Sequence, residues 1–240
     1  MDTGAYNSSP NFPSIQHGQM TDWGFQARMF VRSARNGTLA THSLNYAGFP
    51  FSSVAGFVPD NNARPVILVS PLAEHSRNLS VDHRCSLLIQ GKGEDAQATG
   101  RVTLICEASE FKADEAFLAR YVRLQPSAER LLALGDFYLM RLVPMAVRFI
   151  AGFGSIRWIN PADYAAPWSI EPGEEDRCIA MLEKADLPLL DAFRQANPDA
   201  RCIGMDCDGL EFSSPPRLRL DLTEPAGSFD ELLYQLSQSR

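Results

Sequence analysis

The sequence has few histidines, few cysteines and no long apolar run, and each shortage excludes a class of protein. The four histidines all lie within the first 83 of 240 residues, so the remainder offers no imidazole to a metal or to haem iron. The five cysteines are scattered and form no Cys-x-x-Cys pair, which argues against a disulfide framework and a zinc site. We therefore expect reduced thiols that pack as small core residues, and no bound metal.

Basic residues are also scarce relative to acidic ones. The chain has 22 Lys and Arg against 29 Asp and Glu, a net charge of −7, so it has no electrostatic reason to bind nucleic acid or anionic lipid. No apolar run approaches the length of a membrane span. The first 18 residues have neither a basic start nor an apolar segment typical of a signal peptide, so a cytoplasmic location is expected.

The hydrophobic share of 45% is enough for a real core, and the pattern over residues 21–160 is typical of a β-barrel. Residues 1–20 are rich in Ser, Asn, Pro and Gly and are expected to form a flexible arm. A helix is predicted from Thr21 or Asp22 to Asn36-Gly37, with Gly37 in the left-handed position past its end. Strands are predicted at 38–44, 50–58, 66–69, 86–89, 97–108, 136–143, 145–150 and 155–159. Helices are predicted at 70–81, 114–124 and 127–134.

The pattern changes after a proline-punctuated linker at 161–173. Residues 174–240 predict a small separate domain with helices at 174–196, broken at Pro188, and at 229–236. Strands at 201–206 and 210–212 flank Asp208-Gly209, and this hairpin explains the Asp206-x-Asp208-Gly209 motif better than a calcium loop does. The fold class is therefore α+β: an N-terminal barrel with flanking helices and a small C-terminal domain of helices and strands.

Hydroxyl and basic side chains gather where the predicted strands end. Ser53 lies on the second strand, and Ser70-Pro71 predicts a capped helix start whose free N–H groups favour an anion. Within two turns of that helix follow further donors: His75, Ser76, Arg77 and Asn78. Such a set can hold a phosphate group, although simple capping by Ser70 and a solvated Arg77 explain the same residues.

Several segments resemble the flavin-mononucleotide-binding split barrels related to pyridoxamine 5′-phosphate oxidase, and most closely their haem-utilisation branch. The matching segments are Gly37–Thr41, Phe49–Ser53, Ser70–Leu79, Asp82, Ser86–Leu88 and Gly152–Ile159. The C-terminal part resembles a small domain often fused to these barrels, so the two resemblances together cover about 22–236. The resemblance implies an FMN site at Ser53, Ser70, His75, Ser76 and Asn78, with Arg77 and Arg101 nearby. It also implies a homodimer whose interface brings Trp158 or Phe153 against the flavin ring.

Two functions stay open from the sequence. The first is a flavin-dependent oxidoreductase, in which the cofactor carries the chemistry, since no catalytic triad or carboxylate pair is evident. Oxidation of pyridoxamine phosphate itself is not expected, because the family's Arg-x-His element is missing. The alternative is a haem-binding or haem-utilisation protein, or a non-catalytic binding module. Related haem-degrading proteins carry their iron ligand in the C-terminal part, where this chain has no histidine, so His42 or His83 would have to replace it.

Overall fold

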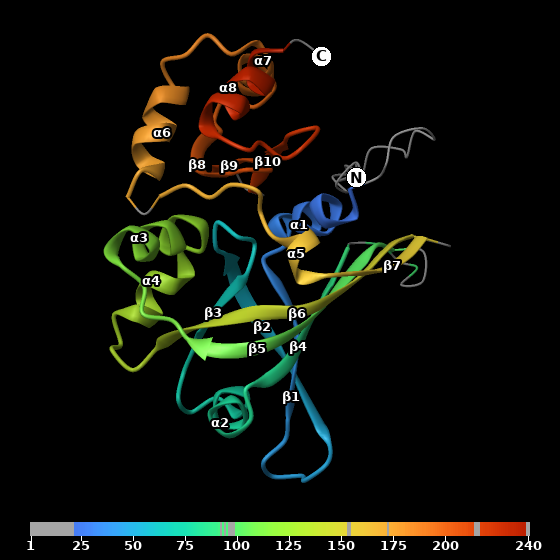
Figure 1. Cartoon of the computed structure of the whole chain (residues 1–240). Coiled ribbons are helices and arrows are strands. Elements are labelled where there is room, and N and C mark those ends of the chain that lie inside the picture. Colours follow the sequence, from blue (N-terminus) through green and yellow to red (C-terminus); the bar gives the residue numbers. More distant parts are fainter. Residues whose placement is uncertain are drawn as a thin grey trace, which may run out of the picture.

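The computed structural model describes residues 22–91, 93, 95, 99–152, 155–171, 173–213 and 217–238. The predicted arm at 1–20, Phe153 and part of the connection at 91–97 lie outside this range. Figure 1 shows a barrel with a smaller unit of helices and strands at one end, and helix α2 with the β1–β2 hairpin at the opposite end. The prediction of an α+β split-barrel fold is confirmed.

Seven antiparallel strands form the larger sheet, in the order β3-β2-β1-β4-β5-β6-β7. They are β1 (Asn36–His42), β2 (Pro50–Pro59), β3 (Pro65–Val69), β4 (Arg84–Gln90), β5 (Arg101–Glu110), β6 (Tyr138–Gly152) and β7 (Ser155–Ile159). An additional pairing joins β3, the first strand of this order, to β6, the sixth, and closes these six strands into a barrel. Closure leaves those strands without free edges, and β7 extends the sheet beyond the second half of β6.

Strand β6 is one continuous element where the sequence predicts two. The register slips between Ile105 and Cys106 of β5, so that Ala146 and Pro144 are their partners and Met145 is the extra residue. Proline has no N–H for the ladder, so a bulge is the position where a long strand tolerates it.

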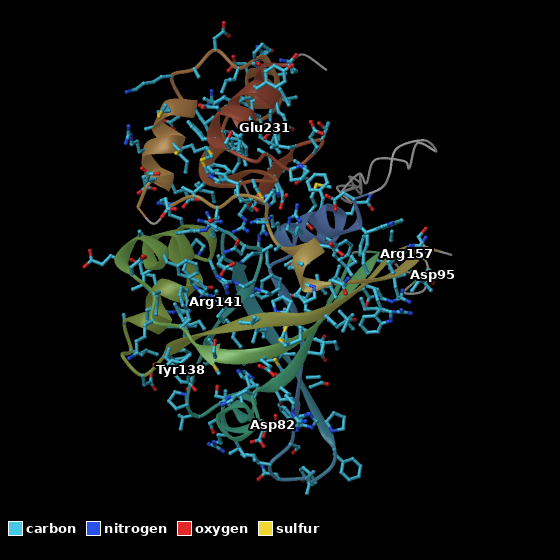
Figure 2. All side chains as sticks on the ribbon, viewed as in Figure 1. Asp82, Asp95, Tyr138, Arg141, Arg157 and Glu231 are labelled. Atoms are coloured by element: carbon cyan, nitrogen blue, oxygen red, sulfur yellow. The ribbon has the colours of Figure 1, made fainter. Side chains whose placement is uncertain are left out.

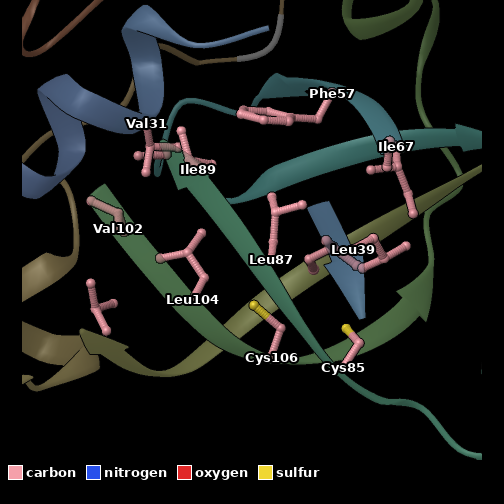
Figure 3. Close-up of a cluster of buried hydrophobic side chains, with 14 of the residues drawn as sticks. Val31, Leu39, Phe57, Ile67, Cys85, Leu87, Ile89, Val102, Leu104 and Cys106 are labelled. Atoms are coloured by element: carbon pink, nitrogen blue, oxygen red, sulfur yellow. The ribbon is translucent and has the colours of Figure 1, made fainter. Parts of the chain in front are cut away.

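Alternate residues of the strands point into the barrel and form its core, part of which Figure 3 shows. Leu39, Leu87 and Leu104 are fully buried there, and the thiols of Cys85 and Cys106 lie on neighbouring strands in direct register. Since successive side chains of a strand point to opposite faces, the same alternation sends the intervening residues outward. Burial of this kind supplies most of the stability of a barrel.

Helix α1 (Trp23–Ser33) covers the barrel end that faces the C-terminal part. Asp22 caps it by accepting a hydrogen bond from the N–H of Phe25 at 2.8 Å, as predicted. The predicted C-terminus was wrong: the helix ends at Ser33, and Gly37 lies inside β1 rather than in a left-handed position. A Cβ at Gly37 would lie 2.7 Å from the carbonyl oxygen of Leu88, so close approach of strand β4 explains this glycine.

The prediction that Ser70 caps a helix was also wrong. Helix α2 begins at Glu74 and ends at Val81, with Ala73 at the N-cap and no side-chain cap. The hydroxyl of Ser70 instead accepts a hydrogen bond from the N–H of Leu72 at 3.2 Å, and the carbonyl of Ser70 accepts from Ala73. Ser70 therefore stabilises a turn that precedes the helix. The helix itself begins four residues later than predicted, at Glu74.

Helices α3 (Glu115–Leu124) and α4 (Ser127–Leu132) pack on the outside of the barrel around a separate apolar cluster that includes Tyr121 and Leu124. A short helix, α5 (Pro161–Tyr164), occupies the first part of the predicted linker. No helix in the described part of the chain is long and apolar enough to cross a membrane.

The C-terminal part has its own apolar cluster, built by three helices and a three-stranded sheet. Its elements are α6 (Glu175–Leu182), α7 (Pro188–Ala196), β8 (Arg201–Asp206), β9 (Gly209–Ser213), β10 (Leu218–Asp221) and α8 (Phe229–Ser237). The β8–β9 hairpin turns at Cys207-Asp208, and a Cβ at Gly209 would lie 2.3 Å from the carbonyl oxygen of Leu220. Only glycine lets β10 approach so closely.

Candidate functional site

The structure joins two of the predicted site residues, Ser53 and His75. The hydroxyl of Ser53 on β2 lies 3.1 Å from Nδ1 of His75 at the start of α2. Both side chains are half-buried, and burial lowers the pKa of His75 from its usual value of 6.5. A neutral imidazole and a hydroxyl can each donate and accept hydrogen bonds. The pair of Ser53 and His75 can therefore bind a polar ligand by hydrogen bonds, as the sequence suggested.

Ser76 and Asn78 lie on the buried side of the same helix. The Asn78 amide donates a hydrogen bond to the hydroxyl of Thr41 at 2.9 Å and accepts one from the N–H of Leu44 at 3.0 Å. It therefore fastens α2 to the end of β1 and has no exposed surface for a ligand. Ser76 is buried as well, and its hydroxyl has no hydrogen-bond partner among the described residues.

The two remaining residues of this group are more exposed. Arg77 lies 4.0 Å from the carboxylate of Glu74, a weak ion pair on the surface of α2. Ser70 is committed to its turn. The acidic Glu74 stands at the N-terminus of the helix, where a bound phosphate would meet like charge.

Arg101 and Trp158 lie elsewhere, on what we call the outer face: the outward-pointing residues of β2, β1, β4, β5, β6 and β7. One register row crosses all six strands on this face: Val54, Thr38, Leu88, Thr103, Arg148 and Trp158. The row beside it holds Ser52, Ala40, Ser86, Ile105 and Ala146. Arg101 lies in the adjoining row with Ile156, which is also exposed.

The outer face mixes polar and apolar side chains, and several large apolar residues on it are exposed in the single chain. Val54 is 76% exposed and Trp158 is 62% exposed, and Ile105 and Met145 are exposed too. The guanidinium of Arg148 lies over the ring of Trp158, with Cζ 5.0 Å from the ring centroid. Exposed large apolar side chains that share one face of a sheet are typical of a contact with a ligand or another protein.

His42 ends this face on β1, a position for which the sequence gave only a tentative role. It is exposed, and it makes no hydrogen bond to any residue that the structure describes. The other two histidines in that part of the chain are engaged, His75 with Ser53 and His83 with the carbonyl of Leu79 at 2.8 Å. Alternation along β1 identifies His42 as outward-facing. That His75 and His83 are held by hydrogen bonds could be seen only in the structure.

Next to His42 lies an ion pair. Arg84 donates two hydrogen bonds to the carboxylate of Asp82, at 2.9 and 2.6 Å, and these hold the pKa of Asp82 well below its usual range. His42 lies near enough to add a small effect of the same sign.

Asp206, Cys207 and Asp208 place three ligand atoms within 4.8 Å of one another, which is the spacing of a metal site. Arginines occupy both carboxylates: Arg28 and Arg32 bind Asp208, and Arg32 and Arg219 bind Asp206. These ion pairs account for the cluster. Sequence reasoning missed the pairs made by Arg28 and Arg32, because each joins residues more than 170 positions apart.

Comparison with known proteins agrees with this architecture. Residues 19–166 match the family described as CREG, beta-barrel. Heme oxygenase HutZ of Vibrio cholerae is 30% identical over 144 residues, which cover 57% of this chain and 81% of that protein. The chloroplast heme oxygenase HOZ of Arabidopsis thaliana is 33% identical over 131 residues, 51% of this chain, but the match spans only 39% of that longer protein.

Two solved structures extend the likeness over almost the whole chain. A heme binding protein from Mycobacterium smegmatis shares 28% identity with a TM-score of 0.55, covering 92% of this chain and 97% of that one. A protein of unknown function from Agrobacterium tumefaciens has a TM-score of 0.72 at 24% identity, covering 95% and 99%, which shows the fold alone. The resemblance to the haem-utilisation branch of the split barrels is thus confirmed. The chain belongs to the CREG β-barrel family.

Proposed function

We propose that this protein binds haem on its outer face, with His42 as the iron ligand, and serves haem utilisation. One observation carries the proposal: His42 is exposed at the border of the outer face, and its side chain makes no hydrogen bond to any of the described residues. The haem-related relatives support the same assignment.

The residues present fit a haem group. Haem is a flat, largely apolar disc with two carboxylates, and the outer face offers small side chains at Ala40 and Ser86 beside apolar Val54 and Ile105. Cations stand nearby on neighbouring strands, at Arg84 and Arg148. Neutral imidazole nitrogen is the commonest axial ligand of haem iron.

In this arrangement the chain binds and orients the group. His42 would hold the iron, the Asp82–Arg84 pair beside it would set the local charge, and Arg148 would attract a carboxylate. When bound, haem supplies redox and dioxygen chemistry, as it does in other proteins. The apolar strands would keep water from one side of the ring.

A homodimer follows from the shape of the site. A bound small molecule normally has 70–90% of its surface buried, whereas the outer face of one chain is open. A second copy laid against Met145, Ile156 and Trp158 would cover this apolar surface and enclose the haem. We therefore propose that two copies associate through the outer face, which sedimentation of the purified protein would test.

A flavin-dependent oxidoreductase is the second candidate function. It is favoured by the hydrogen-bonded pair of Ser53 and His75, which could hold the polar tail of FMN. It is weakened by the burial of Ser76 and Asn78 and by Glu74 at the helix start. The cytoplasmic location expected from the sequence stays a prediction, which cell fractionation would test.

Parallel titrations separate the two functions. Purified protein is titrated with haemin and with FMN and followed by absorbance and flavin fluorescence, using His42→Ala and Ser53→Leu as matched variants. The proposal expects a saturable Soret shift with haemin that is lost in His42→Ala and kept in Ser53→Leu. Saturable FMN binding that Ser53→Leu abolishes and His42→Ala leaves intact would support the second candidate instead.

A further inference from the structure

A cleft of about 290 Å³ lies between the barrel and the C-terminal part, and none of its lining residues belongs to the three register rows described for the outer face. Its barrel side includes Asp60 and Arg64, from the connection between β2 and β3, and Arg141 of β6. Its other side is formed by residues 169–171 and the start of α6. Figure 2 labels Arg141 on the barrel, next to helices α3 and α4. Nothing in the proposed haem site uses this cleft.

One buried carboxylate faces two guanidinium groups in the cleft. Asp60 Oδ2 accepts a hydrogen bond from Nε of Arg64 at 2.8 Å and forms an ion pair with Nε of Arg141 at 3.1 Å. Asp60 Oδ1 is taken by the backbone N–H groups of Asn62 and Arg64. Within the group of Asp60, Arg64 and Arg141, two guanidinium groups share one carboxylate, and the carboxylates of Asp114 and Glu171 also line the cleft. Burial lowers the pKa of Arg141, and the neighbouring Arg64 adds to that effect, which an anion at this position would relieve.

The geometry leaves the anion-binding ends of both arginines available. Each uses Nε toward Asp60, and the terminal amino groups of Arg64 and Arg141 have no partner among the residues that the structure describes. Their side chains are 32% and 23% exposed, so they reach the cleft without being fully solvated. A guanidinium fixed at Nε presents its remaining donors in the planar fork that suits a carboxylate.

Aromatic rings line the cleft beside this charge. The rings of Phe111 and Phe117 stand edge to face with centroids 4.9 Å apart, and Cζ of Arg141 lies 3.7 Å from the centroid of Phe111. Nearby, Nε of Arg120 and Oδ1 of Asn61 are buried and have no hydrogen-bond partner among the residues that the structure describes. Buried polar atoms are normally paired, so these two mark hydrogen-bonding capacity that the protein itself leaves unused.

We propose that this cleft binds a small aromatic carboxylate, with the carboxylate on Arg64 and Arg141 and the ring against Phe111 and Phe117. The charge, the planar donors and the aromatic wall each select one part of such a ligand. The site is independent of haem binding, and its position between the two parts of the chain would let the ligand stabilise their contact.

The test uses 2-naphthoate and its neutral isostere 2-naphthamide in equilibrium dialysis with the full chain. We expect saturable binding of one naphthoate per chain, and binding of naphthamide at least about tenfold weaker because it lacks the charge. Arg141→Gln and Arg64→Gln should each weaken naphthoate binding by about tenfold. Arg130→Gln removes the same charge from exposed α4 and should change nothing.

Two control measurements, thermal unfolding and haemin binding, make the result of the binding test unambiguous. Thermal unfolding shows whether each variant is folded, and Arg64→Gln, on a connecting segment, replaces Arg141→Gln if the strand variant is not. Absence of saturable naphthoate binding would overturn the proposal, as would equal affinity for naphthamide or wild-type affinity in every folded cleft variant. Haemin binding should be the same in wild type and in these variants, which separates this site from the outer face.

Discussion

The guanidinium of Arg28 on α1 binds both carboxylate oxygens of Asp208, which lies 180 residues further along the chain, with two hydrogen bonds of 3.0 Å. Arg32, one helical turn later, also binds Asp208, at 2.8 Å. All three side chains are buried. This contact fixes the β8–β9 hairpin on the first helix and thus joins the C-terminal part to the barrel.

Removing Asp208 should destabilise the protein strongly, because Arg28 and Arg32 would be left buried with one carboxylate fewer. We expect Asp208→Ala to lower the free energy of unfolding by about 3–5 kcal/mol, measured by chemical denaturation. Asp82→Asn breaks an exposed pair with Arg84 and should leave stability essentially unchanged. Equal effects of the two substitutions would show that burial of the first pair has been misjudged.

Asp206 should make the protein sensitive to acid. Burial alone would raise its pKa, but Arg219 and Arg32 outweigh burial and hold the pKa well below the usual value of 3.8. The lowered pKa contributes stability that is present above about pH 4 and is lost as the pH falls toward the folded-state value. Between pH 5 and 2, the free energy of unfolding should fall steeply with decreasing pH for wild type and less steeply for Asp206→Asn, as measured by chemical denaturation. The account fails here if both proteins show the same pH dependence.

His75 should contribute a second, milder pH dependence. Its pKa is lowered from 6.5 by burial, so the unfolded chain takes up a proton first as the pH falls. Stability from this residue is complete above pH 6.5 and is lost as the pH drops through the lowered value. Thermal midpoints measured from pH 7.5 to 5 should fall more in wild type than in His75→Gln. A steeper fall in the variant would contradict the burial of this imidazole.

The three buried cysteines should be unreactive in the native protein. Burial raises the pKa of Cys85 and of Cys207 to about 12, and that of Cys202 to about 11. The thiolate is the reactive form, so we expect Ellman's reagent to titrate the buried thiols of Cys85, Cys106 and Cys207 quickly only after denaturation. Rapid modification of Cys85 in the folded protein would show that the barrel opens more readily than its packing indicates.

Much of the fold could be predicted because local rules and tertiary packing agree. Continuous apolar runs located β3 and β4, Asp22 was one of the two cap residues predicted for the start of α1, and Asp208-Gly209 located the hairpin. Ser70-Pro71 gave a wrong prediction of the helix start, because a serine before a proline suits a turn as well as a helix start. A helix cap and a turn both use the hydroxyl of Ser70 as an acceptor, and only the path of the following backbone decides between the two structures.

The candidate site could be predicted only in part. Residue types indicated hydrogen-bonding chemistry at Ser53 and His75, and the structure brings these two together. The sequence could not show that the amide of Asn78 is hydrogen-bonded to Thr41 and Leu44, because those partners come from β1 and the loop that follows it. Nor could helical periodicity predict the burial of Arg28, whose carboxylate partner is set by the tertiary fold alone.

The central claim, that His42 on the outer face ligates haem, is tested most directly by chemical rescue. His42→Gly protein is mixed with haemin, and the Soret spectrum is recorded before and after free imidazole is added. We predict that the variant lacks the wild-type spectrum and that imidazole restores it, while His83→Gln behaves as wild type. A His42→Gly spectrum identical to that of wild type without imidazole would contradict the account.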